Sequence, residues 1–216
     1  MKHIILSVCL TAPIVLSGCQ TAYYSAMEKV GIHKRDILVD RVEDARDAQT
    51  DTQEEFQTAY ERLVTLTNFD GGEIEKVYNQ LNDDYESSEA AAKRVSDKID
   101  AVEDVAEDLF DEWQEELQQY SNQRLRAASE RKLKDTERQF NQLLRSMRRA
   151  ESKMAPILAT LKDNVLYLKH NLNAAAIAAI KGEFDSLKTE ISALITDMSR
   201  AIEDSNEFID TLKAQG

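Results

Sequence analysis

The stretch from Ile74 to Tyr120 reads IEKVYNQLNDDYESSEAAAKRVSDKIDAVEDVAEDLFDEWQEELQQY, and it decides the fold. Its apolar side chains recur seven residues apart, in two interleaved sets. The first set is Ile74, Leu81, Ser88, Val95, Val102, Leu109 and Glu116, and the second is Tyr78, Tyr85, Ala92, Ile99, Ala106, Trp113 and Tyr120. Twelve of these fourteen positions are apolar or aromatic, so they form one narrow stripe on a helix. The stripe predicts a coiled-coil helix that needs partner helices.

The composition favours helix along nearly the whole chain. The 216 residues include only two prolines and six glycines. Ala, Glu, Asp, Lys, Arg, Leu and Gln dominate, and no run of alternating β-branched residues is bounded by turn residues. We therefore expect an all-α fold. The formal net charge of −13 argues against nucleic acid as a partner, because general nucleic-acid binding needs a basic surface.

Three further apolar stripes predict the partner helices. Before the opening stretch, Asn68–Gly72 is the strongest turn signal in the chain. We expect helices at about 36–68, 73–120, 123–170 and 174–213, with similar lengths that favour an elongated antiparallel four-helix bundle of coiled-coil type. Their stripes are Leu38, Val42, Ala45, Phe56, Ala59, Leu63 and Leu66; Leu133, Phe140, Met147, Met154, Leu161 and Leu168; and Ile177, Ile180, Phe184, Leu187, Ile191, Leu194, Met198, Ala201, Phe208 and Leu212.

The charge changes sign after Tyr120. Residues 97–116 hold ten acidic residues and one basic residue, whereas residues 124–153 hold ten basic and four acidic residues. A chain that folds back near Ser121 would lay these segments side by side, and we expect the acidic segment to neutralise the basic one. Two alternatives stay open. Residues 73–168 could form one continuous rod, and the basic run could contact phosphate groups.

Residues 1–18 are typical of a signal peptide, with a positive start and a short apolar core. Leu16-Ser17-Gly18-Cys19 follows and resembles the lipobox of bacterial lipoproteins. The resemblance implies cleavage after Gly18 and a membrane anchor of acyl chains on Cys19. An ordinary secretory leader is the alternative. Gln20 differs from the aspartate of an inner-membrane retention signal, so we expect the outer membrane, facing the periplasm. Residues 19–35 would then be a tether, and residues 36–216 the bundle.

Three segments resemble a bacterial lipoprotein family catalogued as domain of unknown function 2959. They are Met27–Asp36, Asp70-Gly71-Gly72 and Leu168–Ala174. The resemblance covers essentially the whole chain after the leader. It implies a location in the cell envelope and a helical form, and it brings no activity.

The sequence offers no catalytic constellation, so we expect a protein that is not an enzyme and has no cofactor. Metal binding is not expected either, since neither His33 nor His170 has a Glu three residues before it. The leading hypothesis is a helical scaffold, spacer or partner-binding module. The alternatives are a peptidoglycan-binding or envelope-assembly accessory protein and, last, an envelope enzyme. Partners would be the membrane, through Cys19, and an envelope protein or peptidoglycan; a homo-oligomer stays open. The candidate partner-binding tip is Phe69, Asp70, His170, Asn171, Leu172 and Asn173.

Overall fold

The computed structural model describes residues 33–65, 74–171, 173–182 and 184–214. These residues form five helices and contain no strand, which confirms the all-α prediction. The helices are α2 (Lys34–Thr65), α3 (Ile74–Leu117), α4 (Gln123–His170), α5 (Ala174–Lys181) and α6 (Phe184–Ala214). The expected signal peptide, the lipidation residue Cys19 and the Asn68–Gly72 turn lie outside the described residues.

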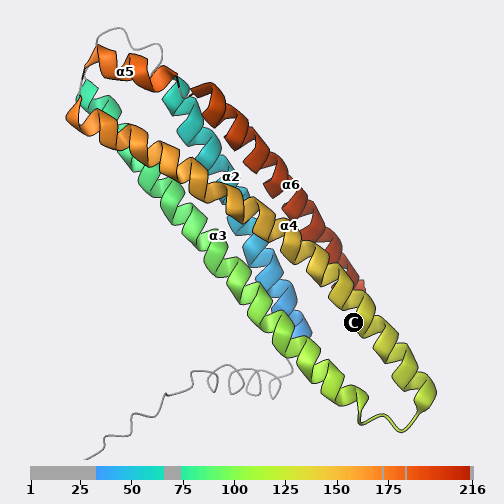
Figure 1. Cartoon of the computed structure of the whole chain (residues 1–216). Coiled ribbons are helices and arrows are strands. Elements are labelled where there is room, and N and C mark those ends of the chain that lie inside the picture. Colours follow the sequence, from blue (N-terminus) through green and yellow to red (C-terminus); the bar gives the residue numbers. More distant parts are fainter. Residues whose placement is uncertain (1–32, 66–73, 172, 183, 215–216) are drawn as a thin grey trace, which may run out of the picture.

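The four long helices lie side by side along one axis, and α5 sits across one end (Figure 1). Packing contacts join α2 to α3, α3 to α4, α4 to α6, and α6 back to α2. Cross-helix bonds give the directions. Lys213 Nζ lies 2.8 Å from Glu43 Oε1, and Gln53 Nε2 lies 3.2 Å from Ser199 Oγ. Residue numbers therefore fall along α6 as they rise along α2.

Helices α3 and α4 turn back on each other, so residues 73–168 do not form one rod. Trp113 Nε1 donates to Ser129 Oγ at 2.8 Å close to the turn, and Ser96 Oγ bonds Glu151 Oε1 at 2.6 Å farther along. Helix α3 ends at Leu117, three residues before the expected end at Tyr120. Asn122 then caps α4, because its side chain accepts the backbone N–H groups of Arg124 and Leu125.

The apolar stripes meet along the axis and form one core. Every residue of the α4 stripe is buried, from Leu133 to Leu168. In α3 the register from Leu81 to Ala106 is buried except at the half-buried Tyr85. Leu109 and Trp113 are also half-buried, and Tyr120, beyond the end of α3, is 39% exposed. The register loses its cover because α3 and α4 extend past the start of α2 and the end of α6 (Figure 1).

The segment expected as one helix over 174–213 consists of two helices, which corrects that prediction. Helix α5 ends at Lys181 and α6 begins at Phe184. The apolar positions continue across this break, with Ile177 and Ile180 buried before it and Leu187 buried after it. Their spacing is the same in one straight helix and in two, so periodicity alone could not reveal the turn at Gly182.

The molecule has a near end, at the start of α2 and the α3–α4 turn, and a far end, at α5. At the near end, the Lys34 ammonium lies 3.1 Å from the Glu112 carboxylate, so the first turn of α2 lies close to the α3–α4 turn. The far end holds α5 and the connection from α4 to α5, at His170–Asn173 (Figure 1). The 48 residues of α4 separate the two ends by about 70 Å, at about 1.5 Å per residue.

Candidate functional site

The connection between α4 and α5 is built by two asparagines. The backbone N–H of Asn171 donates to the Leu168 carbonyl at 3.1 Å, and its side-chain Nδ2 donates to the Tyr167 carbonyl at 3.0 Å. The Asn173 side chain accepts the N–H of Ala176 at 3.0 Å and caps α5. These bonds satisfy backbone groups that a helix end otherwise leaves without partners. Both asparagines therefore stabilise the reversal of the chain between α4 and α5.

The predicted tip is only partly within the described residues. His170, Asn171 and Asn173 lie together at the far end, with His170 and Asn173 exposed and Asn171 half-buried. Phe69, Asp70 and Leu172 lie outside the described part of the chain. A partner-binding role for the six residues stays a prediction.

A shallow groove between α4 and α5 lies next to this connection. It has a volume of about 550 Å³ and is lined by Thr160, Asp163, Asn164, Tyr167, Ala179 and Ile180. The Tyr167 side chain is 45% exposed on this groove, and Asn164 is only 7% exposed. Asn164 Nδ2 has no hydrogen-bond partner among the described residues. An aromatic ring and a carboxylate thus lie on one groove, and the largely buried Asn164 amide lies next to them.

Reasoning from the sequence missed this groove, although two signals were present. Asn164 falls between Leu161 and Leu168 on the buried stripe of α4, where an apolar residue is expected. Leu166 and Tyr167 are large apolar side chains outside that stripe, and they are 48% and 45% exposed. A polar residue inside a core stripe and apolar residues beside it both indicate a surface with a further role.

A second hollow lies at the near end. It has a volume of about 400 Å³, and its lining includes Lys34, Leu109, Glu112, Trp113 and Leu212. Trp113 is held there by its bond to Ser129, and Leu125 beyond it is 55% exposed. The hollow forms where α2 and α6 stop short of the α3–α4 turn.

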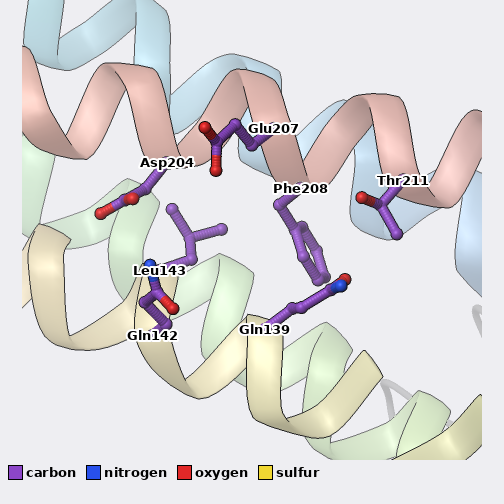
Figure 2. A pocket seen from close by; sticks show the side chains of 7 residues that line it. All are labelled: Gln139, Gln142, Leu143, Asp204, Glu207, Phe208 and Thr211. Carbon is purple, nitrogen blue, oxygen red and sulfur yellow. The ribbon is translucent and has the colours of Figure 1, made fainter. Parts of the chain in front are cut away.

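The third hollow lies between α4 and α6, and Figure 2 shows its side chains. Asp204, Glu207, Phe208 and Thr211 come from α6, and Gln139, Gln142 and Leu143 come from α4. Its volume of about 230 Å³ is below the range of about 300–1,000 Å³ that is typical of small-molecule sites. We therefore treat it as a packing groove between two helices.

The described residues contain no group of three or more His, Cys, Asp or Glu side chains placed to hold a metal ion. Among the same residues, no helix is long and apolar enough to cross a membrane. One carboxyl group is electrostatically unusual. Burial raises the pKa of Asp84 above its ordinary value, and the paired Arg62 guanidinium opposes that shift. This pair joins α2 to α3 towards the far end.

These features define an all-helical protein whose grooves lie at the ends of long packed helices and between them. The chain belongs to the family described as Protein of unknown function (DUF2959), whose model matches residues 23–212. This match confirms the resemblance drawn from Met27–Asp36, Asp70–Gly72 and Leu168–Ala174. No curated protein and no solved structure matches the chain.

Proposed function

We propose that this protein is a lipid-anchored, non-enzymatic spacer or scaffold on the periplasmic face of the outer membrane. In this proposal the long helices form one stiff antiparallel four-helix bundle behind a cleaved signal peptide. Acyl chains on Cys19 hold its near end at the membrane, and the far end carries the surface that meets a partner.

The position of Lys34 carries the proposal. Lys34 lies at one end of the bundle, paired with Glu112, whereas the exposed groove beside Tyr167 lies at the other end. The segment from Cys19 to Lys34 can span at most about 50 Å, at about 3.3–3.6 Å per residue. An anchor at Cys19 would therefore keep the near end at the membrane, with the far groove about 70 Å farther along the bundle.

Labelling with a palmitate analogue tests the anchor. We expect the full chain, expressed in a bacterium, to incorporate the label and to fractionate with outer membranes. Cys19→Ala should abolish both results, because it removes the acylated sulfur. The matched control is Cys9→Ala, since Cys9 is the only other cysteine and lies in the expected leader. Labelling that persists in Cys19→Ala would show that the anchor is elsewhere.

The groove at the far end favours one second candidate, binding to peptidoglycan. Sugars present apolar ring faces together with many hydroxyl groups, so their sites combine an aromatic side chain with carboxylate and amide groups. Tyr167 and Asp163 supply the ring and the carboxylate, and the largely buried Asn164 lines the same groove. A rod anchored at its near end would hold this groove away from the membrane, towards the cell wall.

Sedimentation with purified peptidoglycan tests this candidate. The full chain should pellet with the polymer, and Tyr167→Ala should reduce the bound fraction by about tenfold, as expected for loss of one well-packed aromatic contact. Leu166→Ala is the matched control, because Leu166 is equally exposed and does not line the groove. If the unsubstituted chain stays in the supernatant, the wall-binding candidate is wrong.

A further inference from the structure

A stripe of arginines runs along the outer surface of α4. Arg124, Arg131, Arg138 and Arg145 are spaced seven residues apart, and all four side chains are exposed. In a helix of a coiled-coil bundle, positions seven apart share one face. The stripe therefore extends over about 30 Å of α4, beginning at the near end.

The acidic helix α3 does not neutralise this stripe. Arg148 makes ion pairs from α4 to α3, at 2.7 Å to Asp100 and 2.5 Å to Glu103, and it also pairs with Glu151 of its own helix at 3.0 Å. Arg138 pairs with Asp135 on α4. Among the described residues, Arg124, Arg131 and Arg145 have no carboxylate within ion-pair distance. The expected neutralisation of the basic run by α3 occurs at Arg148 and does not extend to Arg124, Arg131 and Arg145.

Helix α3 carries a complementary stripe of its own. Asp97, Asp104 and Asp111 are seven residues apart and exposed, and Glu107 and Glu115 are exposed beside them. Asp97 pairs with Lys93 on the same helix. The outer surface of α3 is therefore acidic over about the same length as the outer surface of α4 is basic.

The two stripes lie at the same height in the bundle. The Ser96–Glu151 bond marks one limit, and the Trp113–Ser129 bond marks the other. The α3 acids from Asp97 to Asp111 fall between these bonds, and so do Arg131, Arg138 and Arg145 on α4. Because α3 and α4 pack against each other, an acidic row and a basic row run at the same height on neighbouring helices.

Such a surface complements itself under one symmetry operation. A two-fold axis parallel to the helices, set between two copies, keeps height and exchanges the rows, so each α3 faces the partner's α4. A two-fold axis across the helices would place α3 on α3 and α4 on α4, where like charges repel. We propose that this face binds a second copy of the chain, with the helices of the two copies running in the same direction.

The parallel direction agrees with the proposed anchor. It brings both near ends to the same side, where two tethers could enter one membrane. Ion pairs on an exposed surface are individually weak, so the dimer should be weak in dilute solution. Anchoring in one membrane raises the effective concentration of the partner. The charge rows do not depend on the anchor, and only this gain in concentration rests on the proposed function.

Charge reversal in two separate chains tests the dimer. One variant carries Arg131→Glu, Arg138→Glu and Arg145→Glu, which makes both rows acidic. The other carries Asp97→Lys, Asp104→Lys and Asp111→Lys, which makes both rows basic. At low salt, each variant alone should associate about fifty- to hundredfold more weakly than the unsubstituted chain. This estimate assigns a factor of about two to each of six exposed pairs in the dimer.

Mixing the two variants gives the sharper result. In the mixture every acidic row can face a basic row, so association should return to the level of the unsubstituted chain. Analytical ultracentrifugation of the full chain in a neutral detergent measures this directly. Salt at about 1 M should dissociate all of these complexes, because the screening length falls to about 3 Å.

Two further variants control for folding and for net charge. A chain with all six reversals restores the pairing of rows within and between copies, and it should associate like the unsubstituted chain. Lys162→Glu, Lys169→Glu and Arg200→Glu change the net charge equally at exposed residues outside the stripe, and they should leave association unchanged. Thermal unfolding followed by circular dichroism shows whether each variant is folded.

Fluorophores on Gln119→Cys test the direction. This residue is exposed at the near end, so donor and acceptor on two copies should show efficient energy transfer only in the parallel arrangement. Unsubstituted chain carried through the same labelling corrects for dye on Cys9 and Cys19.

Repeating the mixing experiment in chains that carry Cys19→Ala separates this proposal from the anchor, since mixing must still restore association without the acyl chains. A six-reversal chain that stays monomeric, or mixing without recovery, would overturn the dimer. The dimer would also be overturned if reversing the arginine stripe left self-association unchanged and only abolished binding to phosphatidylglycerol vesicles.

Discussion

Two levels of the core are packed by different means. About one third of the way along the bundle from the near end, Phe140 of α4 packs against Phe110 of α3 and Phe208 of α6, with ring centroids 5.5 and 5.9 Å apart. Towards the middle, Gln49 and Thr52 of α2 and Ser88 of α3 are each 0% exposed, with alanines such as Ala91 and Ala92 buried beside this level. One level is aromatic, and the other is polar and small.

The polar level is poorly satisfied. Thr52 Oγ1 donates to the Ala91 carbonyl at 3.3 Å. Among the described residues, the Gln49 side-chain atoms Oε1 and Nε2 and the Ser88 hydroxyl have no hydrogen-bond partner. Burying a polar group without a hydrogen-bond partner lowers the stability of the fold, whereas packing aromatic rings edge to face raises it. We infer that the aromatic level stabilises the bundle. The polar level limits which residues can lie opposite one another, as a buried Asn does in a coiled coil.

Phe140→Ala should have the largest effect on stability. It removes a ring that joins three helices, so we expect the free energy of unfolding in urea to fall by about 3–5 kcal/mol. Leu125→Ala, at a side chain that is 55% exposed, should change it by less than about 0.5 kcal/mol. A loss below about 1 kcal/mol for Phe140→Ala would remove the distinction between the two levels.

Gln49→Leu should change stability in the opposite direction. An apolar side chain of similar volume removes the desolvation penalty of an unpaired amide, so we expect a gain of about 1–2 kcal/mol in urea unfolding. Gln53→Leu is the control, because Gln53 is half-buried and bonds Ser199 at 3.2 Å; it should give no gain. If Gln49→Leu destabilises the protein instead, the amide must have partners in solution.

Arg148→Ala extends the comparison from the core to the charged edge between α3 and α4. Hydrogen bonds to Glu103, Asp100 and Glu151 outweigh burial and raise the pKa of Arg148, so this guanidinium stays charged. We expect a loss of about 1 kcal/mol, since three partly exposed pairs are broken. Arg145→Ala, three residues earlier and without such a pair, should be nearly neutral. The difference between the two variants should shrink in about 1 M salt.

Asp84 should give the smallest effect, seen as a change in pH dependence. Because the folded-state pKa lies above the unfolded one, the folded chain binds the proton more readily. The contribution of Asp84 to stability therefore falls as pH rises from about 4 through the raised pKa. Urea unfolding across pH 4–7 should show Asp84→Asn gaining on the unsubstituted chain as pH increases. A parallel pair of curves would mean that the carboxyl has an ordinary pKa.

Heptad spacing predicted most of the core but not its polar level. The stripe of α4 is buried as expected, because seven-residue spacing requires one covered face whatever the partner. Gln49, Thr52 and Ser88 interrupt their stripes, and from sequence alone they weaken the prediction of burial there. They are buried because the neighbouring apolar turns hold the helices together on both sides.

The site was less predictable than the core. His170, Asn171 and Asn173 were recognisable as a chain reversal, since asparagine caps helices and accepts unusual backbone angles. The groove next to them was not, because Thr160 and Ile180 are twenty residues apart and come together only when α5 turns across the end of α4. No local pattern specifies that angle.

The sequence by itself determined that the chain is helical, which faces of the long helices are buried, and that the charge changes sign after Tyr120, because these depend on spacing along one chain. Only the tertiary structure decided which charges meet. Whether Arg148 or Arg145 reaches Asp100 depends on how α3 and α4 are rotated about their own axes. That rotation is set by the packing of Phe110, Phe140 and the other core side chains. The opening heptads from Ile74 to Tyr120 thus required partner helices, and the packing left a row of arginines facing outward.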